Sequence, residues 1–206
     1  MVDTILNHIQ TDGLIGLIAG YFFGAIPFGL VLCYVAGYGD IRKIGSGNIG
    51  ATNVLRTGNK WLALLTLILD SSKGAIAVLV AHHFLGLHGA FGAALGSVIG
   101  HNFPVYLKFK GGKGVATAFG VLLVLSWPVA LASAATWLVT ALLFRISSLA
   151  AIVAVAMSPV FVMTIGRPQQ VYMIGTIALL ILIRHHANIR RLLKGEEPKI
   201  SFKKKT

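Results

Sequence analysis

The sequence predicts an all-α, polytopic integral membrane helical bundle with seven transmembrane segments, some of them short or broken by proline. Three observations support this fold class. Hydrophobic residues make up 56% of the chain and charged residues only 12%. The mean hydropathy is +0.81, a value that a water-soluble domain of this size would not tolerate. The apolar stretches are continuous rather than alternating, which favours membrane helices over barrel strands.

Seven apolar segments alternate with polar runs along the chain. We expect them at 14–37, 61–85, 90–107, 115–126, 128–144, 146–165 and 171–183. Pro27 marks a kink in the first segment, and Pro128 marks the break between the fourth and the fifth. The seventh is expected to run without a helix breaker into a basic amphipathic helix that stops at Gly195. The first dozen residues contain no Lys or Arg, so we expect the first segment to be retained rather than cleaved as a signal peptide.

The basic residues of the chain predict its orientation in the membrane. One face is expected to carry the loops at about 38–60 and 108–117, Arg145 and the tail at 184–206. That face then holds all of the 18 Lys and Arg except Arg167, on the opposite side, and Lys73, within a segment. Basic loops mark the cytoplasmic side. We therefore expect the N-terminus outside and the C-terminus inside.

Segments 115–126 and 171–183 are short, which leaves a five-segment alternative in which both lie along the membrane surface. The same polar loops remain cytoplasmic in either arrangement. We expect the whole chain, 1–206, to form a single integral membrane domain and to be a monomer. The net charge is +12, and the lysine cluster at 203–205 is most simply a contact with anionic lipid.

A polar segment at 45–56 reads Gly-Ser-Gly-Asn-Ile-Gly-Ala-Thr-Asn-Val-Leu-Arg and lies between two apolar runs. Closely spaced glycines let backbone N–H groups turn toward an anion, and Arg56 can bind phosphate through two parallel hydrogen bonds. Ser46 is a further donor or a nucleophile, and an ordinary cytosolic turn is the alternative. The pattern G-x-G-x-x-G is present, with Asp70 at the distance of a ribose-binding acid. An apolar span precedes it, however, so a dinucleotide fold is not expected.

A second polar segment at 109–117 reads Phe-Lys-Gly-Gly-Lys-Gly-Val-Ala-Thr and opens directly into a helical segment. Unpaired N–H groups at the helix start, the helix dipole and a lysine together form an anion site. The spacing differs from that of the Walker A motif. A flexible basic loop beside lipid head groups is the alternative. We prefer that alternative for Lys108, whereas Lys113, between two glycines, is expected to contact a ligand.

A third polar cluster at 184–191 reads Arg-His-His-Ala-Asn-Ile-Arg-Arg. In a continuous helix, residues three and four apart share a face, so we expect one stripe made of Arg184, His185, Asn188 and Arg191. A histidine beside arginines is expected to be neutral near pH 7 and able to accept or relay a proton. The alternative is a basic helix that lies on phospholipid, and the cluster by itself favours that alternative. All three clusters fall on the same expected face of the membrane.

Other charged residues lie within or beside the apolar segments. Asp70 and Lys73 are three residues apart in the middle of a segment, where they can neutralise one another. We interpret them as a structural clamp that positions the adjacent first loop. Three histidines near the outer end of the same region lack companion carboxylates or cysteines, so a metal site is not expected there.

The inventory of acids and thiols excludes several kinds of chemistry. The chain has only 6 Asp and Glu and a single Cys, Cys33. Paired-carboxylate hydrolysis and two-metal catalysis therefore have little to work with, and no intrachain disulfide is possible. We expect no cofactor and no metal. The hydrogen-bond donors, cations and histidines of the polar loops suit phosphate-bearing substrates and transfer chemistry.

The three polar clusters, quoted at full length as 45–56, 100–117 and 183–197, closely resemble the motifs of the bacterial acyl-phosphate:glycerol-3-phosphate acyltransferases. The similarity extends over nearly the full chain, in the order and spacing of the segments. It implies a multi-pass protein of the bacterial cytoplasmic membrane. It also implies transfer of a fatty acyl group from acyl-phosphate to the sn-1 hydroxyl of glycerol-3-phosphate, the first acylation of phospholipid synthesis, without coenzyme A or acyl carrier protein. Ile49 and His186 depart from the family pattern or vary within it, and neither is given a catalytic role.

The resemblance also implies which residues carry the reaction. Its catalytic positions are Ser46, Arg56, Lys113, His185 and Asn188. Its substrate-binding positions are Gly45, Gly47, Asn48, Thr52, Asn53, His101, Asn102, Lys110, Gly111, Gly112, Gly114, Thr117 and Arg184. The proton of the attacking hydroxyl goes either to the phosphate of the donor or to His185, and both alternatives remain open.

Two other classes of function are weighed against this one. A small membrane transporter of phosphorylated solutes would also use glycine-broken helices and basic loops, but it predicts polar groups that reach the midplane from both sides. The polar groups here are crowded on one face. A nucleic-acid binder would interleave aromatic residues with its basic tail, and this tail does not, so no nucleic-acid partner is expected.

Overall fold

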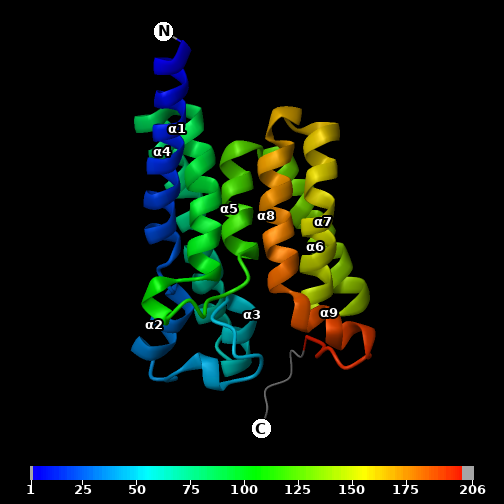
Figure 1. Cartoon of the computed structure of the whole chain (residues 1–206). Coiled ribbons are helices and arrows are strands. Elements are labelled where there is room, and N and C mark those ends of the chain that lie inside the picture. Colours follow the sequence, from blue (N-terminus) through cyan, green and yellow to red (C-terminus); the bar gives the residue numbers. More distant parts are fainter. Residues whose placement is uncertain (1, 201–206) are drawn as a thin grey trace. The chain divides into compact units, whose positions relative to one another are not determined.

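The computed structural model describes residues 2–200, and all of its regular elements are helical over that range. Figure 1 shows them in order. The α-helices are α1 (Val2–Gly24), α2 (Phe28–Val35), α3 (Ala51–Val54), α4 (Lys60–Asn102), α5 (Val115–Leu125), α6 (Trp127–Phe144), α7 (Ser147–Ile165), α8 (Val171–Arg184) and α9 (His186–Leu193). Short 3-10 turns are η1 (Ile41–Lys43), η2 (Leu55–Thr57), η3 (Val105–Leu107) and η4 (Pro168–Gln170). The chain divides into two compact units, Met1–Leu125 and Ser126–Thr206, and each is described by itself.

The first apolar segment is interrupted at Pro27, as the sequence predicts. Helix α1 ends at Gly24 and α2 begins at Phe28. Proline has no N–H to donate and its ring obstructs the preceding turn, so the helix cannot continue through it. The carbonyl of Ile26, left at this break, accepts a hydrogen bond from Lys73 Nζ at 2.8 Å. Such a partner is needed wherever a broken helix lies within a membrane.

Helix α4 is a hairpin of two helices that meet at Gly86. This glycine has φ 65° and ψ −160°, which is not helical. Ala77, Ala81 and Ala93 pack in one buried cluster, although residues 77 and 93 would lie about 24 Å apart in an unbroken helix. The segments expected at 61–85 and 90–107 are therefore the two arms, and the chain turns in the interval between them.

The contact between α1 and α4 is built from small residues. A Cβ atom added at Gly20 would collide with the backbone of Ala93, and one added at Gly96 with the backbone of Leu17. The same holds for several other glycines of both helices. Without a hydrophobic driving force in lipid, close approach of backbones supplies the packing energy of membrane helices. This contact fixes the scaffold of the first unit.

The boundary between α5 and α6 differs from the prediction. We expected the break at Pro128, but the chain leaves helical geometry at Ser126 (φ −161°, ψ 84°) and Pro128 lies in the first turn of α6. Proline is well tolerated there because the first N–H groups of a helix have no partner within the helix.

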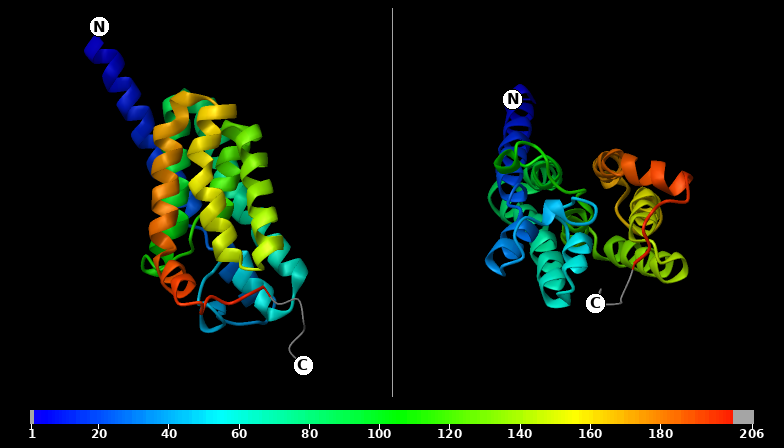
Figure 2. Two further views of the ribbon diagram at one scale, coloured as in Figure 1. Left: turned by 90° about the vertical axis from the view of Figure 1, so that its right-hand side faces the viewer. Right: turned by 90° about the horizontal axis from the view of Figure 1, so that it is seen from below.

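The second unit contains α6, α7 and α8, which run side by side in both views of Figure 2. The predicted continuous helix through 171–195 is wrong, because α8 and α9 are bent by 59°. The chain turns at His185, whose ring Nδ1 lies 2.8 Å from the carbonyl oxygen of Ile181. The Ile181 carbonyl thus has two partners, because it also accepts the backbone N–H of His185 at 3.1 Å, and such added side-chain bonding to the carbonyl four residues earlier is associated with helix bending. The end of the basic helix at Gly195 (φ 71°) agrees with the prediction.

Several of the described helices are long and apolar enough to cross a membrane. They are Gln10–Val35, Lys60–Leu107, Trp127–Phe144 and Ser147–Ile165, with the bent pair Pro168–Arg184 and His186–Leu193 as a fifth candidate. The second of these contains the turn at Gly86, and Val115–Leu125 is shorter. The all-α membrane fold is therefore confirmed, whereas the count of seven spans is not established. The lysines at 203–205 lie outside the described residues.

Candidate active site

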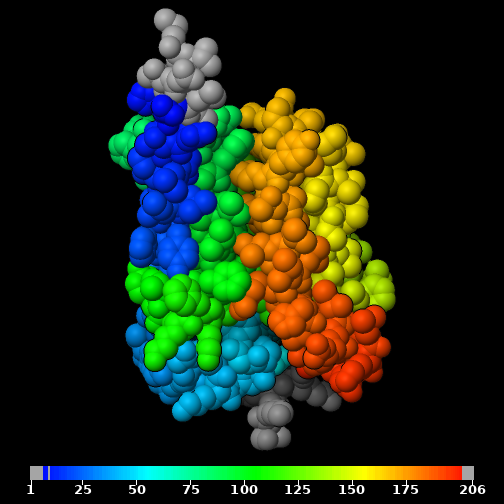
Figure 3. Space-filling view, viewed as in Figure 1, coloured from blue at the N-terminus to red at the C-terminus, as the bar shows by residue number. Residues whose placement is uncertain are grey.

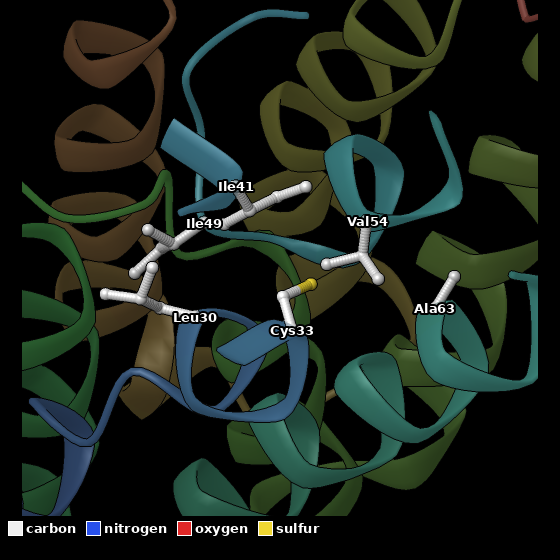
Figure 4. Close-up of a cluster of buried hydrophobic side chains, with 6 residues drawn as sticks. All are labelled: Leu30, Cys33, Ile41, Ile49, Val54 and Ala63. Atoms are coloured by element: carbon white, nitrogen blue, oxygen red, sulfur yellow. The ribbon is translucent and has the colours of Figure 1, made fainter. Parts of the chain in front are cut away.

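Loop one, the segment 38–59 between α2 and α4, rests on a buried apolar base. Ile41, Ile49 and Val54 are 0%, 2% and 0% exposed. They pack with Leu30 and Cys33 of α2 and with Ala63 of α4, as Figure 4 shows. The apolar residues of this polar motif thus point into the protein, so its glycines, hydroxyls and Arg56 are left at the surface.

The side chain of Asn53 holds loop one together from within. Its Nδ2 donates to the carbonyl oxygens of Ile41, Ile44 and Asn48 at 3.0, 3.0 and 2.8 Å. Its Oδ1 accepts from the backbone N–H of Ser46 at 3.1 Å and lies 3.3 Å from the Ser46 hydroxyl. Asn53 is 1% exposed. Both of its polar atoms are therefore occupied by the loop, and they fix the place of Ser46.

Gly45, Ser46 and Arg56 are among the exposed residues of loop one. Gly45 has φ 57°, a conformation that glycine adopts without steric cost. A Cβ atom there would collide with the Nη1 and Cδ atoms of Arg56 and would lie 2.7 Å from Asn53 Oδ1. The Arg56 side chain thus lies directly against Gly45, the residue that precedes Ser46.

Loop two, the segment 103–114 between α4 and α5, folds back on the end of α4. The N–H of Gly112 donates to the carbonyl oxygen of His101 at 2.9 Å. An added Cβ at Gly111 or Gly112 would collide with the backbone or ring of His101. Gly114 has φ 84°, and a Cβ there would lie 2.9 Å from Asn102 Oδ1. At each of the three positions, His101 or Asn102 leaves no room for a side chain, so glycine is required. The absence of side chains also lets a ligand reach the backbone N–H groups of the loop.

Loop two leads into the N-terminus of α5. The N–H of Ala118 donates to the carbonyl of Gly114 at 2.8 Å, which is the first bond of that helix. The positive end of the helix dipole and a half-buried Lys113 lie next to each other at this point. Thr117 and Asn102 are buried beneath them, and Lys110 is exposed. This arrangement suits an anion.

Loops one and two lie at the same end of the first unit. Leu107 of η3 packs against the apolar base of loop one, and Gly29 of α2 lies against the carbonyl of Ile49. In the space-filling view, residues of loop two lie directly above those of loop one (Figure 3). The two segments that the sequence predicted as anion sites are therefore neighbours, although some fifty residues separate them along the chain.

The third cluster belongs to the second unit. His185 is 2% exposed. Because the carbonyl of Ile181 can only accept, the contact with Nδ1 requires a proton on Nδ1. In the neutral ring the lone pair is then on Nε2, the nitrogen that can take a proton. Arg184 is half-buried at the last turn of α8.

Glu197 organises the end of the second unit. Its Oε1 accepts from Asn188 Nδ2 at 2.5 Å and from Ser148 Oγ at 2.6 Å, and its Oε2 accepts from Arg191 Nε at 2.7 Å. Burial raises the pKa of this carboxyl, but the hydrogen bonds from Ser148, Arg191 and Asn188 outweigh it, so the pKa is lowered overall. The predicted stripe is broken by the bend at His185, and Asn188 is instead oriented by a residue nine positions later.

Comparison with known families decides what kind of protein has these loops. The sequence model of a family described as glycerol-3-phosphate acyltransferase matches residues 14–195. This chain belongs to the glycerol-3-phosphate acyltransferase family. The resemblance predicted from the three motifs is thereby confirmed. Among similar relatives, the glycerol-3-phosphate acyltransferase of Rhodospirillum rubrum is 58% identical over 196 residues, 91% of each chain. That of Jannaschia sp. (strain CCS1) is 55% identical over 200 residues, 97% of this chain and 98% of the relative.

Two crystal structures of PlsY, an integral membrane glycerol 3-phosphate acyltransferase, have a similar fold to this family member. The glycerol 3-phosphate form has a TM-score of 0.86 and 42% identity, and covers 92% of this chain and 96% of PlsY. The lysophosphatidic acid form has a TM-score of 0.85 and 41% identity, with the same coverage. Together with the apolar helices, this likeness shows a multi-pass membrane protein.

The predicted site residues of this acyltransferase family member fall into two groups. Loop one, loop two and their helix ends bring together the following residues of the first unit: Gly45, Ser46, Gly47, Asn48, Thr52, Asn53, Arg56, His101, Asn102, Lys110, Gly111, Gly112, Lys113, Gly114 and Thr117. The second unit carries Arg184, His185 and Asn188. Within residues 2–200, no three His, Cys, Asp or Glu side chains are grouped as metal ligands are.

Sequence reasoning missed Glu197 as a residue that supports the family's third motif. The inventory of acids bears only on paired-carboxylate and two-metal catalysis, and it assigns Glu197 no structural role. The available signal was the motif itself, which ends Gly-Glu-Glu at 195–197 after a run of arginines and an asparagine. A carboxylate beside such donors has partners for both oxygens.

Proposed function

We propose that this protein transfers a fatty acyl group from an acyl-phosphate to the sn-1 hydroxyl of glycerol-3-phosphate. The hydroxyl oxygen attacks the acyl carbon, and a tetrahedral intermediate forms. The bond between that carbon and the phosphate oxygen then breaks. Lysophosphatidic acid and inorganic phosphate are released, and the hydroxyl proton leaves with the phosphate. An acyl-phosphate is a mixed anhydride, so the reaction needs no further activation by coenzyme A or an acyl carrier protein.

The single observation that carries this proposal is the pairing of two glycine-rich loops on one apolar base. The reaction brings together two substrates that each carry a phosphoryl group, and it therefore needs two anion sites side by side. Arg56 of loop one and Lys113 of loop two each supply a cation beside such a site. Membership of the family, and the glycerol 3-phosphate and lysophosphatidic acid forms of PlsY, support the acceptor and the product.

Each loop has its own task in this proposal. Ser46, Asn48 and Arg56 bind phosphate and orient the attacking hydroxyl. Lys113 and the N–H groups around Gly111, Gly112 and Gly114 bind the second phosphoryl group and offset the charge of the tetrahedral intermediate. His185 and Asn188 are the catalytic residues that this proposal assigns to the second unit, where Ile181 and Glu197 orient them.

The phosphate oxygen of the donor accepts the hydroxyl proton in this mechanism, and His185 is the competing base. The two differ in their pH dependence. If the phosphate is the base, His185→Gln keeps part of the activity and leaves the shape of the pH-rate profile unchanged. Complete loss of activity together with loss of the acid limb of the profile assigns the proton to His185.

The protein has seven membrane-spanning segments in this proposal and lies in the bacterial inner membrane. Its loops one and two and its C-terminal helix face the cytoplasm, where glycerol-3-phosphate is dissolved, and its N-terminus is outside. The distribution of Lys and Arg supports this orientation.

The test uses purified full-length protein in detergent with acyl-phosphate and glycerol-3-phosphate. Phosphate and lysophosphatidic acid are expected in equal amounts, with no product when acyl-CoA replaces acyl-phosphate. Lys113→Ala is expected to lose activity, and Lys108→Ala, an exposed lysine of the same loop, is the matched control that keeps it. Absence of product from acyl-phosphate would overturn the proposal and leave solute transport as the function to examine.

A further inference from the structure

Three ionisable side chains are buried together inside the first unit. Asp70, Lys73 and His101 are 2%, 1% and 4% exposed. Lys73 Nζ lies 2.9 Å from Asp70 Oδ1, and His101 Nδ1 lies 3.6 Å from the same oxygen. Asp70 and Lys73 come from one arm of the α4 hairpin and His101 from the end of the other. We call these three residues the buried triad.

On one side, the buried triad reaches loop two. The carbonyl oxygen of His101 accepts the N–H of Gly112 at 2.9 Å. The Nε2 edge of its ring lies so close to Gly112 that a side chain at that position would collide with it. The imidazole therefore lies between Asp70 and the glycines that precede Lys113, with one ring nitrogen toward each. A change at Asp70 has a direct path to the shape of loop two.

On the other side, the buried triad reaches the support of loop one. Lys73 Nζ donates to the carbonyl oxygen of Ile26 at 2.8 Å, at the break between α1 and α2, and lies 5.8 Å from the centre of the Phe28 ring. One residue further on, Gly29 lies against the carbonyl of Ile49 in loop one. The triad is thus a continuous polar link between the elements on which the two loops rest.

The energy of the fold alone does not explain such a link. Charges are costly to bury in a membrane protein, and apolar residues of similar size commonly replace a buried ion pair without loss of stability. What an ion pair does provide is geometry, because its partners are held at defined distances and angles. This points to a role in placing other groups.

We propose that Asp70, Lys73 and His101 are positioning residues that set the spacing between loop one and loop two, and so align the two bound substrates for acyl transfer. This inference rests on the proposed function, because it needs a phosphorylated substrate at each loop. In this proposal Asp70 and Lys73 touch neither substrate, and His101, one of the substrate-binding positions named above, acts through its contact with loop two. Its effect is on the distance between the hydroxyl at loop one and the acyl carbon at loop two.

The proposal predicts a distinctive kinetic pattern. Each loop still binds its own phosphoryl group when the link is broken, so KM for acyl-phosphate and KM for glycerol-3-phosphate stay within about twofold of wild type. The reacting atoms are misplaced, however, and a misplacement of about 1 Å lowers kcat by about 100-fold. Distortion of a single loop would instead raise the KM of one substrate.

The test compares Asp70→Asn with the double variant Asp70→Asn/Lys73→Met. The single change leaves Lys73 charged without its partner and should lower the melting temperature. The double change removes that charge, while the Ile26 carbonyl keeps its hydrogen bond from the N–H of Phe28 at 3.2 Å. The melting temperature should therefore recover. The kcat should stay low in both variants, because His101 has lost its carboxylate partner in both.

The matched control is Val78→Ala, a buried apolar change on the same arm of α4. It should lower the melting temperature and leave kcat per folded protein unchanged. The proposal is overturned if the double variant regains the wild-type kcat, if kcat follows melting temperature in all variants, or if only one KM changes. A wild-type protein without acyltransferase activity would instead overturn the proposed function, so the two failures are distinct.

Discussion

Gly45 and Gly37 show how the surroundings of a residue, rather than its backbone angles, decide its importance. Both have a positive φ, 57° and 79°. An alanine at either position would be strained by about 1–2 kcal/mol. Around Gly37 nothing lies within 4 Å of an added Cβ, whereas at Gly45 the added atom meets Arg56 and Asn53. An alanine at Gly37 therefore tests backbone strain alone, whereas an alanine at Gly45 tests strain together with displacement of Arg56 and Asn53.

We expect Gly45→Ala to lower kcat/KM by about 10- to 100-fold, because a displaced guanidinium loses a charge-assisted hydrogen bond worth about 1.5–3 kcal/mol. Gly37→Ala should lower the melting temperature by about as much as Gly45→Ala does, because both substitutions strain the backbone, but it should keep its activity. Steady-state kinetics and thermal unfolding of both variants in detergent are the measurements. Equal activities in the two variants would show that Arg56 does not depend on Gly45.

For single residues, the sequence predicts which side chains belong to the candidate site better than it predicts the structural role of each one. Ser46, Arg56 and Lys113 could be selected because glycines and cations in short segments have few uses other than anion binding. The task of Asn53 could not be predicted, because its bonds run to carbonyls of Ile41 and Ile44 up to twelve residues away. Glu197 was missed for the same reason, since its partner Ser148 lies 49 residues earlier. Both depend on tertiary contacts.

Helix α9 is held by its hydrogen bonds to Glu197 rather than by continuity with α8. The lowered pKa of Glu197 means that the folded protein favours the carboxylate. The stabilisation is therefore fully present above the pKa of the unfolded chain, about 4.5, and it is lost as pH falls through the still lower folded pKa. It should be constant from neutral pH down to about pH 5.

We expect Glu197→Gln to lower stability at pH 7 by about 1.5–3 kcal/mol, because charge-assisted hydrogen bonds become neutral ones. The difference in melting temperature from wild type should shrink as the pH is lowered below about 4.5. Glu196→Gln, a change at the exposed neighbouring acid, is the control and should have little effect. A difference that grows on acidification would contradict the assignment.

The glycines of α1 and α4 give a second prediction at the scale of elements. Gly96→Ala should destabilise the first unit by about 1–3 kcal/mol, because its Cβ would meet the backbone of Leu17. Gly175→Ala, in the interior of α8 with nothing within 4 Å, should stabilise by up to about 1 kcal/mol through helix propensity. Thermal unfolding of the two variants should shift in opposite directions, and shifts of the same sign would refute the packing argument.

Helix breaks could be predicted where one residue imposes them. Pro27 ends α1, and Gly86 ends the first arm of α4, as their chemistry requires. The bend at His185 could not be predicted, because histidine is compatible with a helix and its contact with Ile181 becomes visible only in the fold. The break at Ser126 was misplaced by two residues, since proline within the first turn and proline at a break have the same sequence signature.

The Lys and Arg of the whole chain gather in a few polar segments of the sequence, and this gives a testable orientation. In a Cys33→Ala background, we expect His88→Cys to react with a membrane-impermeant maleimide in intact cells. Lys199→Cys should react only after the cells are permeabilised, because positive charge marks the cytoplasmic side. Both native residues are exposed. Labelling in the reverse order would invert the proposed topology.

The internal hydrogen bonds of loop one have a consequence for how a small solute is captured. Glycerol-3-phosphate has few atoms with which to make contacts, so little binding energy is available for ordering a disordered segment around it. The five contacts through Asn53 already hold that segment in one conformation. The loop thus loses its conformational entropy during folding rather than on binding. Little of the binding free energy for glycerol-3-phosphate is then used to order the loop.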